Sequence, residues 1–185
     1  MDGVFLAQSG RFSQRDKSFG ERSNTQCTAI AAFSIPALSS WRPPYSRDHL
    51  DLLVRGGEEY NVQCKEFVKD HVYLAPDELQ PEIIIGSLRV RIEVLQCGEG
   101  SCTPTTELDL RTLVSTFRDV FSFRYPALGF IFMGHSKSVS FLPASSNSHQ
   151  LWFFNPHSVN SNNDVCISGR NGCCRLFTPT LLMVW

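Results

Sequence analysis

The sequence lacks the features that mark membrane, secreted or nucleic-acid-binding proteins. No apolar run approaches the ~18–20 residues that cross a bilayer, and the apolar group near Val4 is too short for a secretory signal. The 17 Lys and Arg residues nearly balance the 18 Asp and Glu residues, which leaves a net charge of −1. With no basic field and no apolar span, we expect neither nucleic acid nor a membrane as a partner.

The cysteines show no metal-binding or disulfide pattern. They number seven, an odd count, and no pair has the C-x₂-C spacing of a zinc site. Several lie within apolar runs, which favours free thiols in a reducing compartment over a disulfide framework. We therefore expect an intracellular protein, cytoplasmic or nuclear, that holds no metal and needs no cofactor.

Length and composition predict one compact domain spanning residues 1–185, most simply a monomer. The hydrophobic fraction of 42% and the charged fraction of 19% are ordinary for a chain with a real core. Helical patterns come first and alternating, strand-like patterns follow, an order that predicts an α+β fold. Leu108–Phe121 is an additional candidate helix in the middle of the chain.

The first apolar segment predicts a buried helix that begins beside a cysteine. Residues 1–26 are polar and mostly loop-like, whereas Thr28–Leu38 is small and apolar. Cys27 would then stand at the mouth of the helix, where we expect it to be exposed. Pro36 should kink or shorten the far end.

The next pattern is also helical, with a predicted interruption. Ser46 is a suitable N-cap, and apolar residues follow at helical spacing. The pair Gly56-Gly57 should break or kink this helix, because glycine is a poor helix former. His49 falls on this segment and is expected to be solvated.

The later chain has the period-2 pattern of strands. Leu88, Val90, Ile92 and Val94 alternate with polar residues, as in a half-buried strand, and leave Arg89 and Arg91 on a solvated face. Four further short strands are predicted, at Leu128–Met133, Ser138–Leu142, Leu151–Phe154 and Cys173–Phe177. Their close succession favours mainly antiparallel pairing.

Cys27 and His157 are candidates for a nucleophile and its base. A helix N-terminus favours the thiolate form of a cysteine, because unpaired N–H groups point at it. His157 follows an apolar strand and precedes a Ser/Asn-rich loop, a usual place to present a side chain. Asn155 lies two residues earlier and would point the same way in extended backbone. Its amide oxygen could fix the imidazole tautomer, as in a Cys-His-Asn triad.

These residues lie in segments that resemble a known family. Gly10–Gly20, Gln26-Cys27 with the small residues after it, and Leu151–Ser158 resemble, in order and spacing, the active-site segments of the herpesvirus large tegument protein proteases. They resemble more closely the tegument-type deubiquitinases of bacteria and mobile elements. The resemblance covers both ends of the chain and is weaker in the middle.

The resemblance implies a papain-like fold and roles for four residues. Cys27 matches the nucleophile, His157 the base, Asn155 the third member and Gln14 a donor to the oxyanion. The commonest family pattern has Asp where this chain has Asn155, so the imidazolium would be stabilised less. The implied partners are ubiquitin and ubiquitin chains, with NEDD8 as a second modifier. Trp41 would line the channel for the Gly-Gly tail, unless it is an ordinary core anchor.

Two alternatives to a deubiquitinase remain from the sequence. A non-catalytic module could keep the fold and bind the modifier without cleaving it, which Asn155 and the apolar C-terminus suggest. A cysteine protease for ordinary peptides would cleave unstructured chains that lack a Gly-Gly end.

Overall fold

The computed structural model describes residues 10–41, 44–68, 72–94, 129–134, 137–143, 151–159 and 173–177. Contacts divide the chain into two units, residues 1–92 with 127–185 and residues 93–126. All helices and strands with described bounds belong to the first unit, and only Glu93 and Val94 of the second are described. The predicted helix Leu108–Phe121 lies outside the described residues, and the single-domain assignment stays a prediction.

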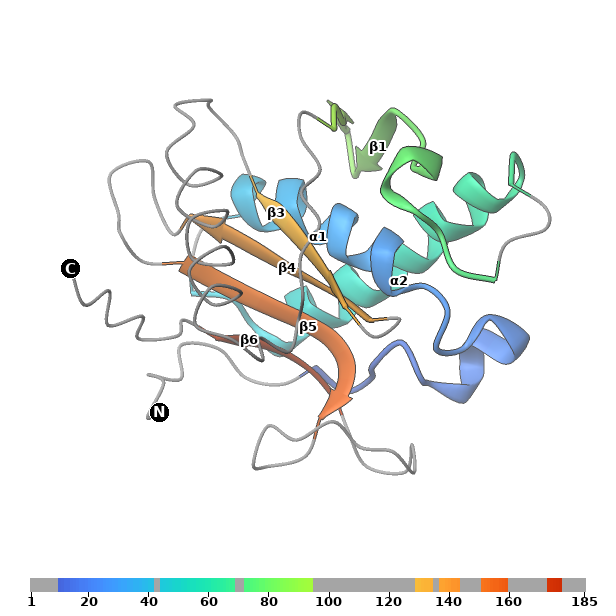
Figure 1. Ribbon diagram of the computed structural model, residues 1–185. Coiled ribbons are helices and arrows are strands. Elements are labelled where there is room, and N and C mark those ends of the chain that lie inside the picture. Colours follow the sequence, from blue (N-terminus) through green and yellow to red (C-terminus); the bar gives the residue numbers. More distant parts are fainter. Residues whose placement is uncertain are drawn as a thin grey trace, which may run out of the picture. The chain divides into compact units, whose positions relative to one another are not determined.

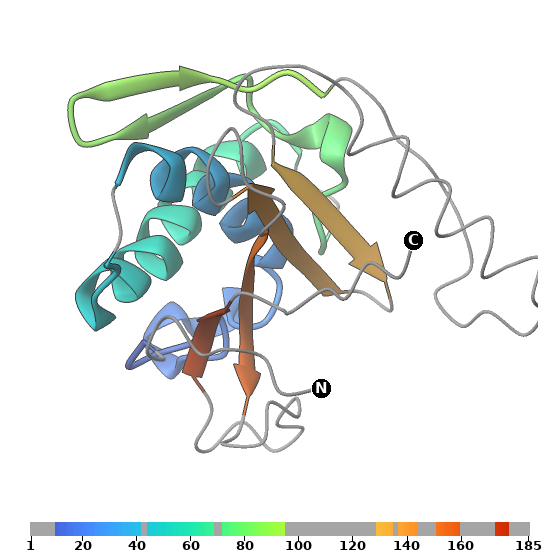
Figure 2. The ribbon, with the colours of Figure 1, turned by 90° about the vertical axis from the view of Figure 1, so that its left-hand side faces the viewer.

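Helix α1 (Cys27–Ser40) is the centre of the fold, as its apolar sequence predicts. Buried residues run along most of its length, because the helix is apolar on several sides and packs between α2 and a sheet. Figure 2 shows α1 and α2 on the same side of that sheet. The helix continues four residues beyond Pro36, so the proline does not shorten it.

Helix α2 (Arg47–Lys65) is continuous through Gly56-Gly57, so the predicted break there is wrong. A Cβ on Gly56 would lie 2.3 Å from the Phe33 ring, and one on Gly57 would lie 2.5 Å from the Ile30 backbone. The two glycines therefore let α1 approach closely, and packing against α1 outweighs their low helix propensity. Ser46 caps α2 as predicted, since its hydroxyl accepts the His49 N–H.

Four antiparallel strands form the main sheet in the order β3-β4-β5-β6 (Figure 1). They are β3 (Phe130–Gly134), β4 (Lys137–Pro143), β5 (Leu151–Val159) and β6 (Cys173–Phe177), and all four match predicted strands. Two hydroxyl pairs join α1 to β4: Thr28 Oγ1 to Ser138 Oγ at 3.0 Å and Ser34 Oγ to Ser140 Oγ at 2.5 Å. They fix how α1 lies along the sheet.

A second, two-stranded sheet is an antiparallel hairpin of β1 (Glu82–Ile85) and β2 (Leu88–Arg91). The predicted strand at 88–94 is therefore real but shorter, and its partner β1 was not predicted. The expected half-burial is confirmed for Val90 and Ile92, which are partly buried, and is wrong for Leu88 and Val94, which are 45% and 48% exposed. In the hairpin, Ile83 is buried in the core and Ile85 packs against it.

Two short 3-10 helices complete the described elements, η1 (Lys17–Arg22) and η2 (Pro76–Glu78). None of the helices in the described ranges is both long enough and apolar enough to cross a membrane.

Candidate active site

Cys27 is the first residue of α1, at the end of the helix where backbone N–H groups point outward. Its side chain is 2% exposed, so the expectation of an exposed nucleophile is wrong. Gln26 and Thr28 on either side are also buried, and Thr28 is bonded to Ser138 of β4. The contact between α1 and the sheet therefore extends to the first turn of the helix, where Cys27 is buried.

His157 and Asn155 form the hydrogen-bonded pair that their spacing predicts. The two lie inside β5, which is longer than predicted, and not in a loop after it. The Asn155 Oδ1 atom lies 2.7 Å from His157 Nδ1 and 3.0 Å from the His157 backbone N. Since an amide oxygen can only accept, Nδ1 carries the ring proton and Nε2 has the free lone pair.

The imidazole is neutral at physiological pH. Burial, the largest cause, and the positive charges of Lys137 and Arg15 together lower the pKa of His157 from 6.5 to about 4. Its Nε2 atom is buried and has no hydrogen-bond partner among the described residues. A neutral ring with an unused Nε2 lone pair is the state that a general base needs.

The irregular pairing of β5 explains how His157 is buried. Between Asn155 and Val159, β5 has more residues than the facing part of β6, so the register shifts. Such a bulge breaks the strict alternation of side chains. Pro156, His157 and Ser158 are consequently all buried in succession.

Gln14 lies in the segment that precedes α1, here named the N-terminal strap (residues 10–26). Its backbone N–H donates to the Pro156 carbonyl at 3.0 Å, which docks the strap on β5 directly beside His157. The Gln14 side chain is buried, and its Nε2 donates to Asn24 Oδ1 at 3.3 Å. The strap thus holds the Gln14 backbone against the residue that precedes His157.

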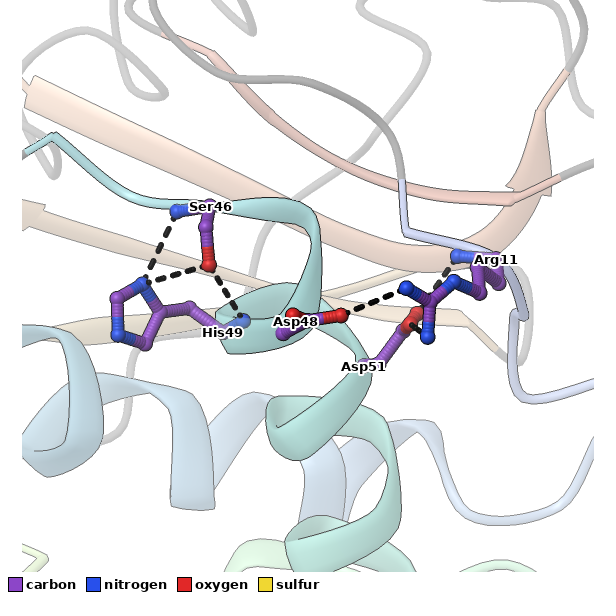
Figure 3. A network of polar contacts seen from close by, with 5 residues as sticks. All are labelled: Arg11, Ser46, Asp48, His49 and Asp51. Carbon is purple, nitrogen blue, oxygen red and sulfur yellow. Dashed lines mark hydrogen bonds and ion pairs between the residues drawn. The ribbon is translucent and has the colours of Figure 1, made fainter.

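Ion pairs and backbone bonds hold the strap in place (Figure 3). Asp51 of α2 accepts the Arg11 backbone N–H at 2.6 Å, and the Arg11 guanidinium reaches Asp48 at 2.8 Å. Gly10 is required at its position, because a Cβ there would lie 2.8 Å from Asp51 Oδ1 and 2.7 Å from Cys174 Sγ. The start of the strap is therefore tightly packed against Asp51 and Cys174.

The sheet register brings these segments to one end of the molecule. Ser140 pairs with Phe154, so continuing the antiparallel register puts Ser138 level with Pro156. Ser138 contacts Thr28, next to Cys27, and Pro156 contacts Gln14, next to His157. The start of α1, the strap and the bulged part of β5 therefore meet, as the ribbon also shows (Figure 1).

Trp41 lies at the opposite end of α1 from Cys27. Trp41 follows Cys27 by fourteen positions, which is roughly 20 Å along the helix axis at 1.5 Å per residue. The indole packs against the core and its ring centroid lies 5.0 Å from that of His49. This position favours the core-anchor alternative over a channel wall beside Cys27.

The site includes one residue that the sequence did not single out. Asn24 has a left-handed backbone, with φ at 71°, and contacts Gln14 twice. Asparagine tolerates this conformation better than most residues, but a Ser-Asn pair in a polar loop predicts only a turn. Within the described ranges, no group of three His, Cys, Asp or Glu side chains could hold a metal ion.

A thiol at the start of a buried helix, set against an antiparallel sheet that carries a His–Asn pair, defines the papain-like α+β class of protein. The chain matches the family described as the herpesvirus tegument protein, N-terminal conserved region, over residues 9–184. The chain therefore belongs to this family, and the resemblance seen in its short motifs is confirmed.

A solved structure shows the same fold. It is the ubiquitin-specific protease encoded by murine cytomegalovirus tegument protein M48, in complex with a ubiquitin-based suicide substrate. The TM-score is 0.69 at 15% sequence identity, and the match covers 92% of this chain and 72% of that chain. None of the curated proteins matches this chain.

Proposed function

We propose that the protein is a cysteine-dependent deubiquitinase that hydrolyses the bond after the C-terminal glycine of ubiquitin or a ubiquitin-like modifier. The observation that carries the proposal is the His157–Asn155 pair, bonded at 2.7 Å, whose Nε2 has no hydrogen-bond partner among the described residues. The pair lies in the part of β5 on which the strap docks. Membership of the tegument family and the likeness to a ubiquitin-specific protease support it.

In the proposed reaction, His157 Nε2 takes the proton of the Cys27 thiol as the sulfur attacks the carbonyl carbon of the modifier's last glycine. Gln14 Nε2, with a backbone N–H at the start of α1, donates to the oxyanion. The C–N bond then breaks, and the His157 imidazolium gives its proton to the departing lysine amine. Asn155 keeps the ring in its Nδ1–H tautomer throughout.

The second half regenerates the enzyme. His157 takes a proton from a water molecule whose oxygen attacks the thioester carbonyl. The carbon–sulfur bond breaks, the thiolate recovers the proton from His157, and the modifier leaves as a carboxylic acid that loses its second water-derived proton to the solvent. Each proton taken by the imidazole is returned, so no oxidant or cofactor is needed.

Burial of the nucleophile supports a glycine-ended substrate. A thiol that is 2% exposed can be reached only by a narrow chain end. Two consecutive glycines have no side chains to exclude, so a Gly-Gly tail fits such an approach better than an ordinary peptide does. Ubiquitin and NEDD8 are therefore the modifiers to test, ahead of unstructured peptides.

The test is covalent capture with a ubiquitin probe whose C-terminus is an electrophile. We expect an adduct with the wild-type protein and none with Cys27→Ala. Cys64→Ala is the matched control, because Cys64 is a second buried thiol on α2 and its loss should leave the adduct intact. Labelling that survives Cys27→Ala, or no labelling by either ubiquitin or NEDD8 probes, would contradict the proposal.

A turnover assay separates cleavage from binding alone. Defined ubiquitin chains and a NEDD8 fusion should be cut by the wild-type protein and bound but uncut by Cys27→Ala. Tight binding of the modifier without any turnover by the wild-type protein would instead identify a binding module.

A further inference from the structure

The side-chain amide of Gln14 has one orientation that its neighbours permit. Its Nε2 lies 3.3 Å from Asn24 Oδ1, and the same oxygen lies 3.0 Å from the Arg15 Nε–H. A guanidinium has donors and no acceptor, so the Asn24 atom that faces it must be the carbonyl oxygen. The Gln14 atom that faces this oxygen must in turn be the amino group, because two acceptors would repel.

Nothing at the other end of the Gln14 amide competes with this arrangement. Its Oε1 atom is buried and has no hydrogen-bond partner among the described residues. The orientation is therefore set from one side, by the sequence of contacts from Arg15 to Asn24 to Gln14. One N–H of the amino group is used by Asn24, and the second N–H is left for another acceptor.

The backbone of Asn24 strengthens the same contact. Its N–H donates to the Gln14 carbonyl at 2.9 Å, so main chain and side chain of Asn24 both bind Gln14. The left-handed φ of 71° costs free energy for a residue other than glycine, and such residues occur often at functional sites. In this conformation, the Asn24 side-chain amide contacts Gln14, ten positions earlier in the strap.

We propose that Asn24, held by Arg15, is a positioning residue that fixes Gln14 as a hydrogen-bond donor toward the reacting carbonyl. This inference rests on the proposed deubiquitinase activity and adds a residue that acts through Gln14, without itself touching substrate.

The test uses two substitutions that keep the backbone of residue 24. Asn24→Gly retains the left-handed conformation but removes the acceptor, whereas Asn24→Asp retains an acceptor for both Arg15 and Gln14. We expect Asn24→Gly to lower kcat on a ubiquitin substrate about tenfold with little change in KM, as for a slightly misplaced donor. Asn24→Asp should keep kcat close to wild type.

A double variant shows whether Asn24 acts through Gln14 or through a general effect on the loop. Gln14→Ala alone should lower kcat roughly 10²–10³-fold, the usual loss of an oxyanion donor. Adding Asn24→Gly to Gln14→Ala should then cost nothing more. A further tenfold loss in the double variant, or full kcat in Asn24→Gly alone, would overturn the proposal.

A measurement without turnover keeps this inference distinct from the proposed function. In the Cys27→Ala protein, the NMR signals of the Gln14 side-chain NH₂ should move upfield with Asn24→Gly, which removes the acceptor, and should keep hydrogen-bonded, downfield positions with Asn24→Asp. Unchanged signals in Asn24→Gly would overturn the positioning role, whatever the protein cleaves. A protein that no ubiquitin probe labels would refute the activity while the NMR result still decides the contact.

Discussion

The two ends of helix α1 differ in how their polar groups are satisfied. At the C-terminal end, the Ala37 carbonyl accepts the Trp41 N–H at 3.0 Å and the Leu38 carbonyl accepts the Tyr45 hydroxyl at 2.9 Å. At the N-terminal end, both polar atoms of the Gln26 amide, Gln14 Oε1 and His157 Nε2 are buried with no hydrogen-bond partner among the described residues.

This contrast separates stability from function within one helix. Buried polar groups without partners cost free energy, and native proteins keep few of them. In the proposed reaction, the substrate carbonyl and its leaving amine supply partners for polar groups at this end of the helix.

The largest expected effect on stability is at the C-terminal end of α1. Leu38 is 1% exposed in the core, so Leu38→Ala should lower the free energy of unfolding by about 2–5 kcal/mol. Urea unfolding measures the loss. Labelling of the remaining folded protein by the ubiquitin probe should be unchanged. Loss of labelling in step with stability would show that the two ends are not separable.

At the N-terminal end of α1, where buried polar groups lack partners among the described residues, we expect a contribution to stability that is lost in acid. An unfolded histidine takes up a proton near pH 6.5, whereas folded His157, with a pKa of about 4, stays neutral. Between these values the unfolded state binds more protons, so stability falls as pH falls, by roughly 3 kcal/mol from pH 7 to pH 4. His157→Gln should remove this part of the acid sensitivity. Parallel pH curves for both proteins would contradict the assignment.

Asn155→Asp should make the N-terminal end of α1 less sensitive to acid. A carboxylate at 2.7 Å from Nδ1 favours the imidazolium, so the pKa of His157 should rise and the acid-induced loss of stability should shrink. Hydrolysis should increase, by about tenfold, because the charged ring is better stabilised in the reaction. NMR titration of His157 checks the first effect, with Asn155→Ala as the control that lacks any acceptor. A pKa no higher in the Asp variant than in the wild type would refute this account.

The smallest effect on stability is expected from removing the Tyr45 hydroxyl, which bonds near the C-terminal end of α1. Tyr45→Phe removes the bond to the Leu38 carbonyl and should cost about 1 kcal/mol of stability. The midpoint of thermal unfolding should fall by about 2–4 °C. Hydrolysis should stay at the wild-type rate, and a slower Tyr45→Phe enzyme would show that this end also tunes the site.

The sequence predicts the elements of the site better than their surroundings. The small apolar run after Cys27 and the Asn155-x-His157 spacing both reflect local rules, helix periodicity and the alternation of a strand. The His–Asn contact accordingly forms as expected. The burial of Cys27 does not follow from such rules, and its neighbour Thr28 bonds to a strand more than a hundred residues away.

The wrongly predicted break in α2 has the same origin. Gly56-Gly57 looks like a helix break until Phe33 and Ile30 of α1 occupy the space that side chains would need. The contacts of Asn24 with Arg15 and Gln14 also have no signal in the local sequence. In both places, contacts in the folded protein decide the outcome.

The strap that carries Gln14 also shields the sheet from other chains. Strand β6 is at the edge of the sheet, and Cys174 there bonds to the strap, its carbonyl accepting from Gly10 at 3.2 Å and its N–H donating to Phe12 at 2.9 Å. An edge with open backbone groups recruits further strands. A substitution that detaches the strap would thus expose the backbone groups of β6 and give the protein a tendency to form intermolecular β-structure.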